Sequence, residues 1–452
     1  MIDIIIPLTI FIIAGYLIAK NYDAKAILFI AGLSLLYCAV FAGKIILDEK
    51  ESTGVIWLDP LKMVTLIFIK QLGNIGLTIM VLFGFSSYMT HIGANDVTVH
   101  LLTKPLKKIK SPYFLVPVIF LLGNLLSLVV PSASSLAVLL MATLYPVLKF
   151  SGMSTLTAGA VIATTATIMP TPLGADNVLA AEKLGIPLVE YVTYYHAPVS
   201  IPTLFLMAIA HYFWQKFMDK KQVVEDTGID KDKLHIVQDL PPSYYGLFPV
   251  LPLLFVFVLG IFFKEIKIGI IEITFICLGI ALCVELIRKG KVKETTKDLG
   301  IFFNGMGAGL AQVVSLIVAA SLLVEGLKKQ GTIDMIINSV ENIENVGIFL
   351  TLIFTSATAI IGFISGSGLA VFYSFINIIP EITAGLNVNS VSVALPMQLT
   401  ANLIRSASPV AAVIIIVAAI TKSNPFDIVK RTSIPVIIGI LSTLILSILL
   451  FS

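Results

Sequence analysis

The chain has 452 residues, of which 57% are hydrophobic and only 13% are charged, and its formal net charge is +3. Soluble globular proteins carry about 25% charged residues, so this composition argues against a soluble enzyme or a nucleic-acid-binding protein. Apolar runs of roughly 20 residues, the length that a helix needs to cross the hydrocarbon core, recur along the chain. Because these runs do not alternate polar and apolar residues as the strands of a membrane barrel do, the sequence predicts an all-α polytopic membrane protein.

Apolar segments are expected to form helices along the whole chain, and several are too short to span a bilayer alone. In chain order they cover residues 2–20, 25–47, 61–90, 113–130, 132–149, 154–175, 187–214, 246–263, 267–287, 298–325, 347–364, 367–380, 389–405, 409–421 and 427–451. The long polar stretch 215–243 is predicted to be a solvated linker between a first half, 1–214, and a second half, 244–452.

The two halves contain similar short sequences at a nearly constant spacing. "SSLAV" at 134–138 matches "SGLAV" at 367–371, and Thr165-Ala166 matches Thr400-Ala401. A break rich in Ser, Thr and Pro follows each match, at 171–177 in the first half and at 405–409 in the second. These recurrences, in the same order and among the same succession of apolar runs, predict a duplicated unit.

An odd number of crossings per unit inverts the second unit relative to the first, as in many secondary transporters. The expected architecture is therefore two inverted repeats with about ten transmembrane helices plus two opposed re-entrant hairpins. The hairpins are expected at 113–149 and 347–380, and each is followed by a broken helix, at 154–186 and 389–421.

The basic residues give an independent test of this topology. With ten crossings, 20 of the 30 lysines and arginines fall on the side of the central linker and eight on the other. Cytoplasmic loops carry an excess of positive charge. The linker is therefore expected in the cytoplasm, and both termini on the periplasmic side.

A proline and three serines interrupt the apolar run 123–148 at "VPSASS", residues 130–135. Non-helical backbone is tolerated at membrane depth only where it is buried in protein or lines a wet cavity. We therefore expect a turn at 131–134 that is reached from the cytoplasm. Its counterpart is "SGSG" at 365–368, reached from the outside, so the two tips are expected to meet near the midplane.

Helices that begin in the middle of a membrane present unpaired N–H groups and a positive dipole end, which favour an anion. Serine adds hydroxyl donors, and glycine allows close approach of a ligand. The alternative is that proline and serine only kink ordinary helices. The expected substrate-binding residues are Ser132, Ala133, Ser134, Ser135, Thr171, Ser365, Gly366, Ser367, Gly368, Arg405, Ser406 and Ser408.

Arg405, in "LTANLIRSASPV", lies inside an apolar span, where arginine is rare and usually functional. Its planar fork suits a bidentate grip on a carboxylate; the alternative is a structural ion pair with Asp176. The expected coupling-ion residues are Asn124, Asp176, Asn177 and Asn402. For Asp176 the alternative is a cap on the helix that resumes at Asn177.

The sequence resembles the anaerobic C4-dicarboxylate carrier family of the DcuC type, within the ion-transporter superfamily. The likeness rests on "GNLLSLVVPSASSLAVLLMATLYPVL" (123–148) and "GADNVLAAEKLGIPLVEYV" (174–192). The resemblance implies a homodimeric carrier in the bacterial inner membrane, with a scaffold domain and a transport domain that moves as an elevator. The implied substrates are succinate, fumarate and malate, carried by cation symport or by exchange.

The resemblance implies no cofactor and no firm metal site, with H⁺ or Na⁺ as the coupling ion. Sodium-coupled dicarboxylate carriers have a Ser-Asn-Thr signature at the tips, whereas these tips read Pro-Ser-Ala-Ser-Ser and Ser-Gly-Ser-Gly. That difference favours H⁺, with Na⁺ at the hairpin tips as the alternative. The lipid bilayer and a dicarboxylate are the expected partners, and nucleic acid is not.

Other functions remain open at this point. The same architecture could carry another organic anion or an amino acid, or form a channel. A different class is an intramembrane serine hydrolase, with Ser367 as nucleophile and His196 or His211 as base. Such an enzyme requires the nucleophile and the base to lie within hydrogen-bonding reach of each other.

Overall fold

The computed structural model describes residues 2–20, 22–104, 106, 111–128, 130, 132–221, 240–263, 265–266 and 268–452. Within these ranges the regular elements are helices, and no strand occurs. Six helices are long and apolar enough to cross a membrane, or up to eight if each of two bent pairs forms one span. These helices confirm the expected class of an all-helical, multi-pass membrane protein, whereas the expected number of about ten crossings is not established.

The first half begins with three helices, α1 to α3, continues through mostly shorter elements, and ends with the long helix α12. Its elements are α1 (Ile2–Ala19), α2 (Ala24–Phe41), α3 (Asp59–Gln71), η1 (Leu72–Gly76), α4 (Leu77–His91), α5 (Ala94–Thr103), α6 (Pro112–Leu126), α7 (Ala133–Thr143), α8 (Tyr145–Phe150), α9 (Thr155–Ala163), α10 (Ala175–Lys183), α11 (Leu188–Glu190), η3 (Tyr191–His196) and α12 (Ala197–Lys221). The segments η1 and η3 are π-helical.

The second half has a comparable succession. Its elements are η5 (Ser243–Val250), α13 (Leu251–Phe262), α14 (Ile270–Lys289), α15 (Val292–Gly309), η6 (Leu310–Val314), α16 (Ser315–Gln330), α17 (Thr332–Val340), α18 (Val346–Ser365), α19 (Gly368–Phe375), α20 (Ile379–Gly385), α21 (Ser390–Ile404), α22 (Ala412–Thr421) and α23 (Pro425–Phe451). In both halves a five-residue π segment, η1 or η6, interrupts a long helix.

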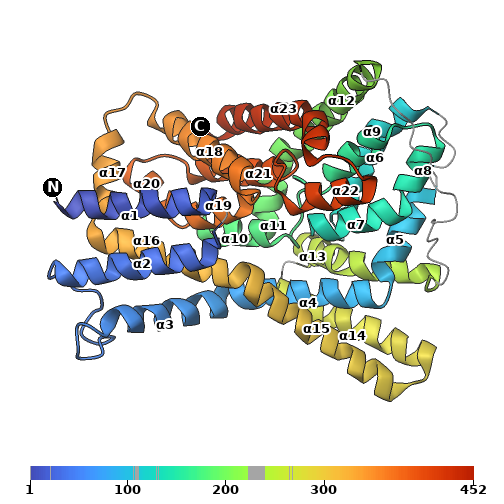
Figure 1. Ribbon diagram of the computed structural model, residues 1–452. Coiled ribbons are helices and arrows are strands. Elements are labelled where there is room, and N and C mark those ends of the chain that lie inside the picture. The colour runs from blue at the N-terminus through green and yellow to red at the C-terminus, as the bar shows by residue number, and fades with distance from the viewer. Residues whose placement is uncertain are drawn as a thin grey trace.

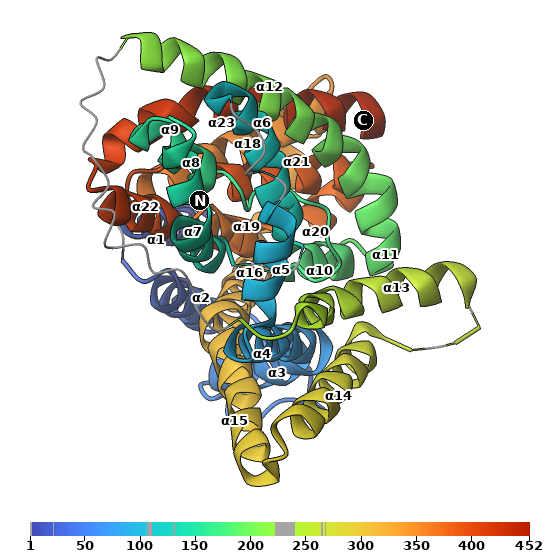
Figure 2. The same cartoon turned by 90° about the vertical axis from the view of Figure 1, so that its right-hand side faces the viewer.

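The helices form two layers. Figure 1 shows α3, α4, α14 and α15 along one edge of the molecule and α12 and α23 along the opposite edge. Figure 2, turned by 90°, shows the same division from the end. We call α2, α3, α4, α14, α15, η6 and α16 the lower layer, and α6–α12 with α18–α23 the upper layer. Helices of different halves pack on each other within each layer: α2 on α16 and α4 on α15 below, and α12 on α23 above.

The predicted start of the linker 215–243 is too early by about seven residues. Helix α12 continues to Lys221, so the first residues of that stretch are helical rather than solvated. Gln215 is fully buried, and Asp219 forms an ion pair with Arg431. Residues 222–239 lie outside the described part of the chain.

A buried polar cluster joins three helices of the upper layer. The guanidinium of Arg431, which is 0% exposed, donates to Asp219 of α12 and to Thr157 of α9. Gln215 donates to the backbone carbonyl of Arg431 at 2.8 Å, and Ser154 donates to Asp219 at 2.8 Å. Because a buried charge is tolerated only when it is paired and hydrogen-bonded, this cluster holds α9, α12 and α23 in a fixed arrangement.

Candidate functional site

The first tip is shaped by a helix cap. The side-chain oxygen of Ser132 accepts hydrogen bonds from the backbone N–H of Ser135 at 3.3 Å and from its hydroxyl at 3.0 Å. Serine is a preferred N-cap because it satisfies an N–H that the helix leaves unpaired. Helix α7 therefore begins at Ala133, within the predicted turn 131–134; Pro131 lies outside the described residues.

The second tip depends on two glycines. Helix α18 ends at Ser365, and Gly366 has a φ of +72°, a left-handed conformation that favours glycine. A Cβ on Gly368 would lie 2.3 Å from the carbonyl oxygen of Ala401. Glycine at this position therefore allows α19 to start directly against α21. The predicted turn 365–368 agrees with these helix ends.

Helices are interrupted within 154–186 and within 389–421, and the first break is longer than expected. Helix α9 ends at Ala163 and α10 begins at Ala175, whereas the sequence placed that break at 171–177. The second break separates Ile404 from Ala412, close to the expected 405–409. The difference arises because Thr164 and Thr165 direct their hydroxyls back to carbonyls of α9, which competes with continuation of a helix.

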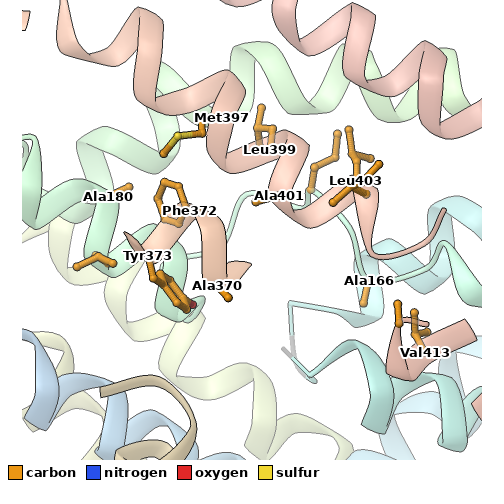
Figure 3. Close-up of a cluster of buried hydrophobic side chains, with 14 of the residues drawn as sticks. Ala166, Ala180, Ala370, Phe372, Tyr373, Met397, Leu399, Ala401, Leu403 and Val413 are labelled. Carbon is orange, nitrogen blue, oxygen red and sulfur yellow. The ribbon is translucent and has the colours of Figure 1, made fainter. Parts of the chain in front are cut away.

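The two breaks are bonded to each other across the halves. Arg405 donates from Nη2 to the carbonyl of Ala166, and the hydroxyl of Ser406 donates to the carbonyl of Ala163 at 2.9 Å. Figure 3 shows Ala166 beside Val413 at these breaks and apolar side chains of α19 and α21 packed together nearby. The cation of Arg405 thus lies next to the carbonyl end of α9, where the helix dipole favours positive charge.

A cavity of about 690 Å³ is lined by both tips and both breaks. From the upper layer it receives the first residues of α7, α10, α19 and α22; from the lower layer it receives residues of α4 and η6. The predicted residues that line it are Ser132, Ala133, Ser134, Ser135, Thr171, Asp176, Asn177, Gly366, Ser367, Gly368, Asn402 and Arg405. Four helix N-termini around one cavity provide several N–H groups for an anion.

Four predicted residues do not line this cavity and bond to the backbone instead. The Ser365 hydroxyl donates to Ile361, that of Ser406 to Ala163, and that of Ser408 to Phe363. Asn124, which is fully buried, donates to the carbonyls of Phe120 and Thr164, and its oxygen accepts from Thr167. These contacts join the tips and breaks to neighbouring helices.

Asp176 lies in the first turn of α10 and is held by side chains of α21. One carboxylate oxygen accepts from Nε2 of Gln398 at 2.9 Å and from Nδ2 of Asn402 at 2.7 Å. The helix cap is Gly174, and it has no side-chain capping bond. The structure therefore differs from the alternative in which Asp176 caps α10.

Arg405 and Asp176 do not form the ion pair considered as an alternative. Within the described ranges, no lysine, arginine or histidine nitrogen lies within 4.0 Å of the Asp176 carboxylate. The Nε of Arg405 is buried without a hydrogen-bond partner in that part of the chain. An unpaired buried donor is costly.

Several polar residues of this site were not identified from the sequence. Gln398 is fully buried and also donates to Asn177 at 2.6 Å; Tyr373 and Gln312 line the cavity. A signal for Gln398 was present, because Gln398, Asn402 and Arg405 are spaced by four and three residues and share one helix face. No comparable pattern marked Tyr373 or Gln312.

The contacts of the histidines do not match a serine hydrolase. Nδ1 of His196 pairs with Ser200 at 3.0 Å, and Nε2 of His211 pairs with Thr164 at 3.1 Å. Neither histidine is hydrogen-bonded to Ser367 in the described structure. That part of the chain also contains no group of three or more His, Cys, Asp or Glu residues that could hold a metal ion.

Three comparisons with known proteins agree with the family resemblance and the fold. The family model "DcuC: C4-dicarboxylate anaerobic carrier" matches residues 2–452. The chain is 38% identical over 448 residues to the probable anaerobic C4-dicarboxylate transporter DcuC of Vibrio cholerae, covering 98% of this chain and 97% of the relative. It is 35% identical over 449 residues to the anaerobic C4-dicarboxylate transporter DcuC of Escherichia coli K12, covering 98% and 96%.

The solved structure of MtrF from Neisseria gonorrhoeae, which illuminates a class of antimetabolite efflux pumps, aligns with a TM-score of 0.61. The alignment covers 98% of this chain and 97% of MtrF at 14% sequence identity. At this identity the likeness bears on the fold alone.

Proposed function

The chain belongs to the DcuC family of anaerobic C4-dicarboxylate carriers, and from this premise we propose that it transports succinate, fumarate and malate across the bacterial inner membrane. Family membership makes it a membrane transporter rather than an enzyme. The observation that supports the substrate class is the cavity, where Arg405 and four helix N-termini surround one space. Its volume of about 690 Å³ is within the range of small-molecule sites.

One carboxylate of the substrate binds beside Arg405 in this proposal. The serines at the tips contribute further donors, because the hydroxyls of Ser134 and Ser367 have no hydrogen-bond partner among the described residues and both line the cavity. A guanidinium can hold a carboxylate through two parallel hydrogen bonds. The exposed backbone of the tips then completes the shell around the anion.

Uptake into proteoliposomes tests the function directly. We expect saturable uptake of labelled succinate, stimulated by internal fumarate and competed by malate, because all three are four-carbon dianions. Butyrate, glutamate and sulfate serve as matched competitors of different chemistry. Absence of saturable succinate flux, or stronger competition by an amino acid, would contradict the proposed substrate class.

We infer an elevator mechanism from the position of the cavity between the two layers. The lower layer would be the scaffold, and the upper layer, with both tips and both breaks, would be the transport domain. Helix succession in the two halves supports an inverted repeat, and the family resemblance supports a homodimer. Both termini are placed in the periplasm on the basis of the basic residues.

Asp176 is the proposed coupling carboxylate. Its second oxygen makes no hydrogen bond within the described ranges, and it lines the same cavity as Arg405. A carboxylate that faces the substrate site can accept a proton before the dianion crosses. We favour H⁺ over Na⁺, since the tips lack the Ser-Asn-Thr signature of the sodium-coupled branch.

Asp176→Asn is expected to abolish uptake driven by a pH gradient and to retain succinate–fumarate exchange. Asparagine can still accept the hydrogen bonds of Gln398 and Asn402, but it cannot carry a proton. Exchange should persist because the carrier binds a dicarboxylate in each direction and therefore does not need a proton to return. The two fluxes are measured in the same proteoliposomes, with a Na⁺ gradient as the control; normal pH-driven uptake by the variant would exclude Asp176 from coupling.

A further inference from the structure

We propose that Gln312 binds the second carboxylate of the substrate and thereby sets the preference for dicarboxylates over monocarboxylates. This inference rests on the proposed transport function and adds a specificity residue to the same cavity. Gln312 belongs to the lower layer, whereas Arg405 and both tips belong to the upper layer. The substrate would therefore be held between two walls.

The local structure presents Gln312 to the cavity. It is the third residue of the π segment η6, where neighbouring Val313 and Val314 are buried and Gln312 is exposed. Its side-chain amide forms no hydrogen bond with any described residue, and it lines the cavity. Short π segments inside α-helices occur frequently at functional sites, because the extra residue turns a side chain away from the regular face.

Two serines of α4 complete the same wall. Ser86 and Ser87 line the cavity, and their hydroxyls also lack hydrogen-bond partners in the described ranges. Gln312, Ser86 and Ser87 therefore provide unused neutral donors. Arg405, which lines the same cavity, provides the positive charge; Figure 2 shows α4 of the lower layer beneath α7 and α19 of the upper layer.

The upper wall carries the positive charge of Arg405, whereas the lower wall carries neutral donors. A substrate with two carboxylates can use both walls. A monocarboxylate satisfies Arg405 and leaves the amide of Gln312 facing an alkyl chain. A dicarboxylate reaches both walls and gives Gln312 a charged acceptor, which makes a stronger hydrogen bond than a neutral acceptor. The lower wall therefore discriminates between substrates by whether they carry a second carboxylate.

A neutral donor on this wall is also compatible with movement of the upper layer. Contacts with the scaffold must break when the loaded transport domain moves. A second arginine would hold the dianion to the scaffold through bidentate, charge-assisted bonds. An amide recognises the carboxylate with less attraction, so the substrate can leave the scaffold with the moving layer.

The test compares succinate and butyrate binding to the purified full-length protein. Gln312→Leu is expected to raise the Kd for succinate about tenfold, as loss of one hydrogen bond to a charged group predicts, and to leave the Kd for butyrate unchanged. Gln312→Glu should weaken succinate binding further, because the new carboxylate repels the second charge of the ligand. Gln312→Asn should restore part of the ratio between the two Kd values.

Asn304→Leu is the matched control, because Asn304 is an exposed amide of α15 that does not line the cavity. It should bind both acids like the wild type. An unchanged succinate-to-butyrate ratio in Gln312→Leu, or an equal change for both acids, would overturn the role of Gln312. Failure of the wild type to bind succinate at all would instead contradict the proposed function.

Discussion

Arg405→Ala is expected to abolish dicarboxylate transport while the protein remains folded. The charge pair that is lost is the one between Arg405 and the bound substrate carboxylate. Truncation of one partner of a buried, hydrogen-bonded charge pair costs about 2–5 kcal/mol, which corresponds to a loss of about 30-fold or more in affinity. The variant also loses the bond from Arg405 to Ala166. Because the hydrogen bond from Ser406 to Ala163 still joins the two breaks, we expect the fold to persist. Succinate uptake and binding measure the effect.

Two further variants separate charge from geometry. Arg405→Lys keeps the positive charge but cannot form the planar bidentate contact, so we expect intermediate binding. Lys430→Ala removes a charge at an exposed position of α23 and should transport like the wild type. Full transport by a well-folded Arg405→Ala protein would remove Arg405 from the binding site.

Arg431→Leu is expected to cause the largest loss of stability, about 3–5 kcal/mol. The substitution leaves Asp219 as a charge in a buried environment without its guanidinium partner, and an uncompensated buried charge is strongly destabilising. The side chains of Arg431 and Asp219 are 1% and 9% exposed, so water cannot replace the lost partner. The loss is measured as a lower melting temperature in detergent, with the fraction of folded protein after heating determined by size-exclusion chromatography.

The double variant Arg431→Leu with Asp219→Leu provides the control. Replacing both partners of a buried ion pair with apolar residues is often neutral or stabilising, so the double variant should recover much of the lost stability. Ser154 and Thr157 would lose an acceptor in this variant, which limits the recovery. If the double variant is as unstable as the single one, the ion pair is not the source of the stability.

Much of the site could be predicted from the sequence because its signals are local. The serines and glycines at the tips are unusual inside apolar runs, and the constraint on non-helical backbone at membrane depth is strong. The same reasoning identified Arg405, since arginine in a span is rare. The structure brings these residues together around one cavity.

The parts that could not be predicted depend on contacts between distant segments. Ser406 and Ser408 looked like ligands, yet their hydroxyls bond to Ala163 and Phe363. The sequence cannot distinguish a serine that binds a ligand from one that donates to a backbone carbonyl. Only the position of neighbouring backbone in the folded protein decides between these two roles. Gln312 was missed for a similar reason: its position in η6, opposite the tips, follows from the packing of the two layers.

The first break was longer than predicted because threonine is a weak signal. Thr164 and Thr165 could have continued α9, but their hydroxyls bond to carbonyls of the preceding turn. Such bonds are compatible with a helix and with its end. Pro172, in "TPLGAD" (171–176), gave a stronger signal, which placed the predicted break too late in the chain.

In the proposed transport cycle, the formal charges of Arg405 and of Asp176 before it binds a proton bear on how the carrier responds to voltage. They cancel, so a bound succinate leaves the loaded site with a net charge of −2. Each elementary charge that crosses a membrane potential of 100 mV costs about 2.3 kcal/mol, so entry of the dianion against an interior-negative potential costs about 4.6 kcal/mol. Exchange for another dianion cancels this cost, and so does symport with two cations. With a third cation, the membrane potential itself drives accumulation of the substrate.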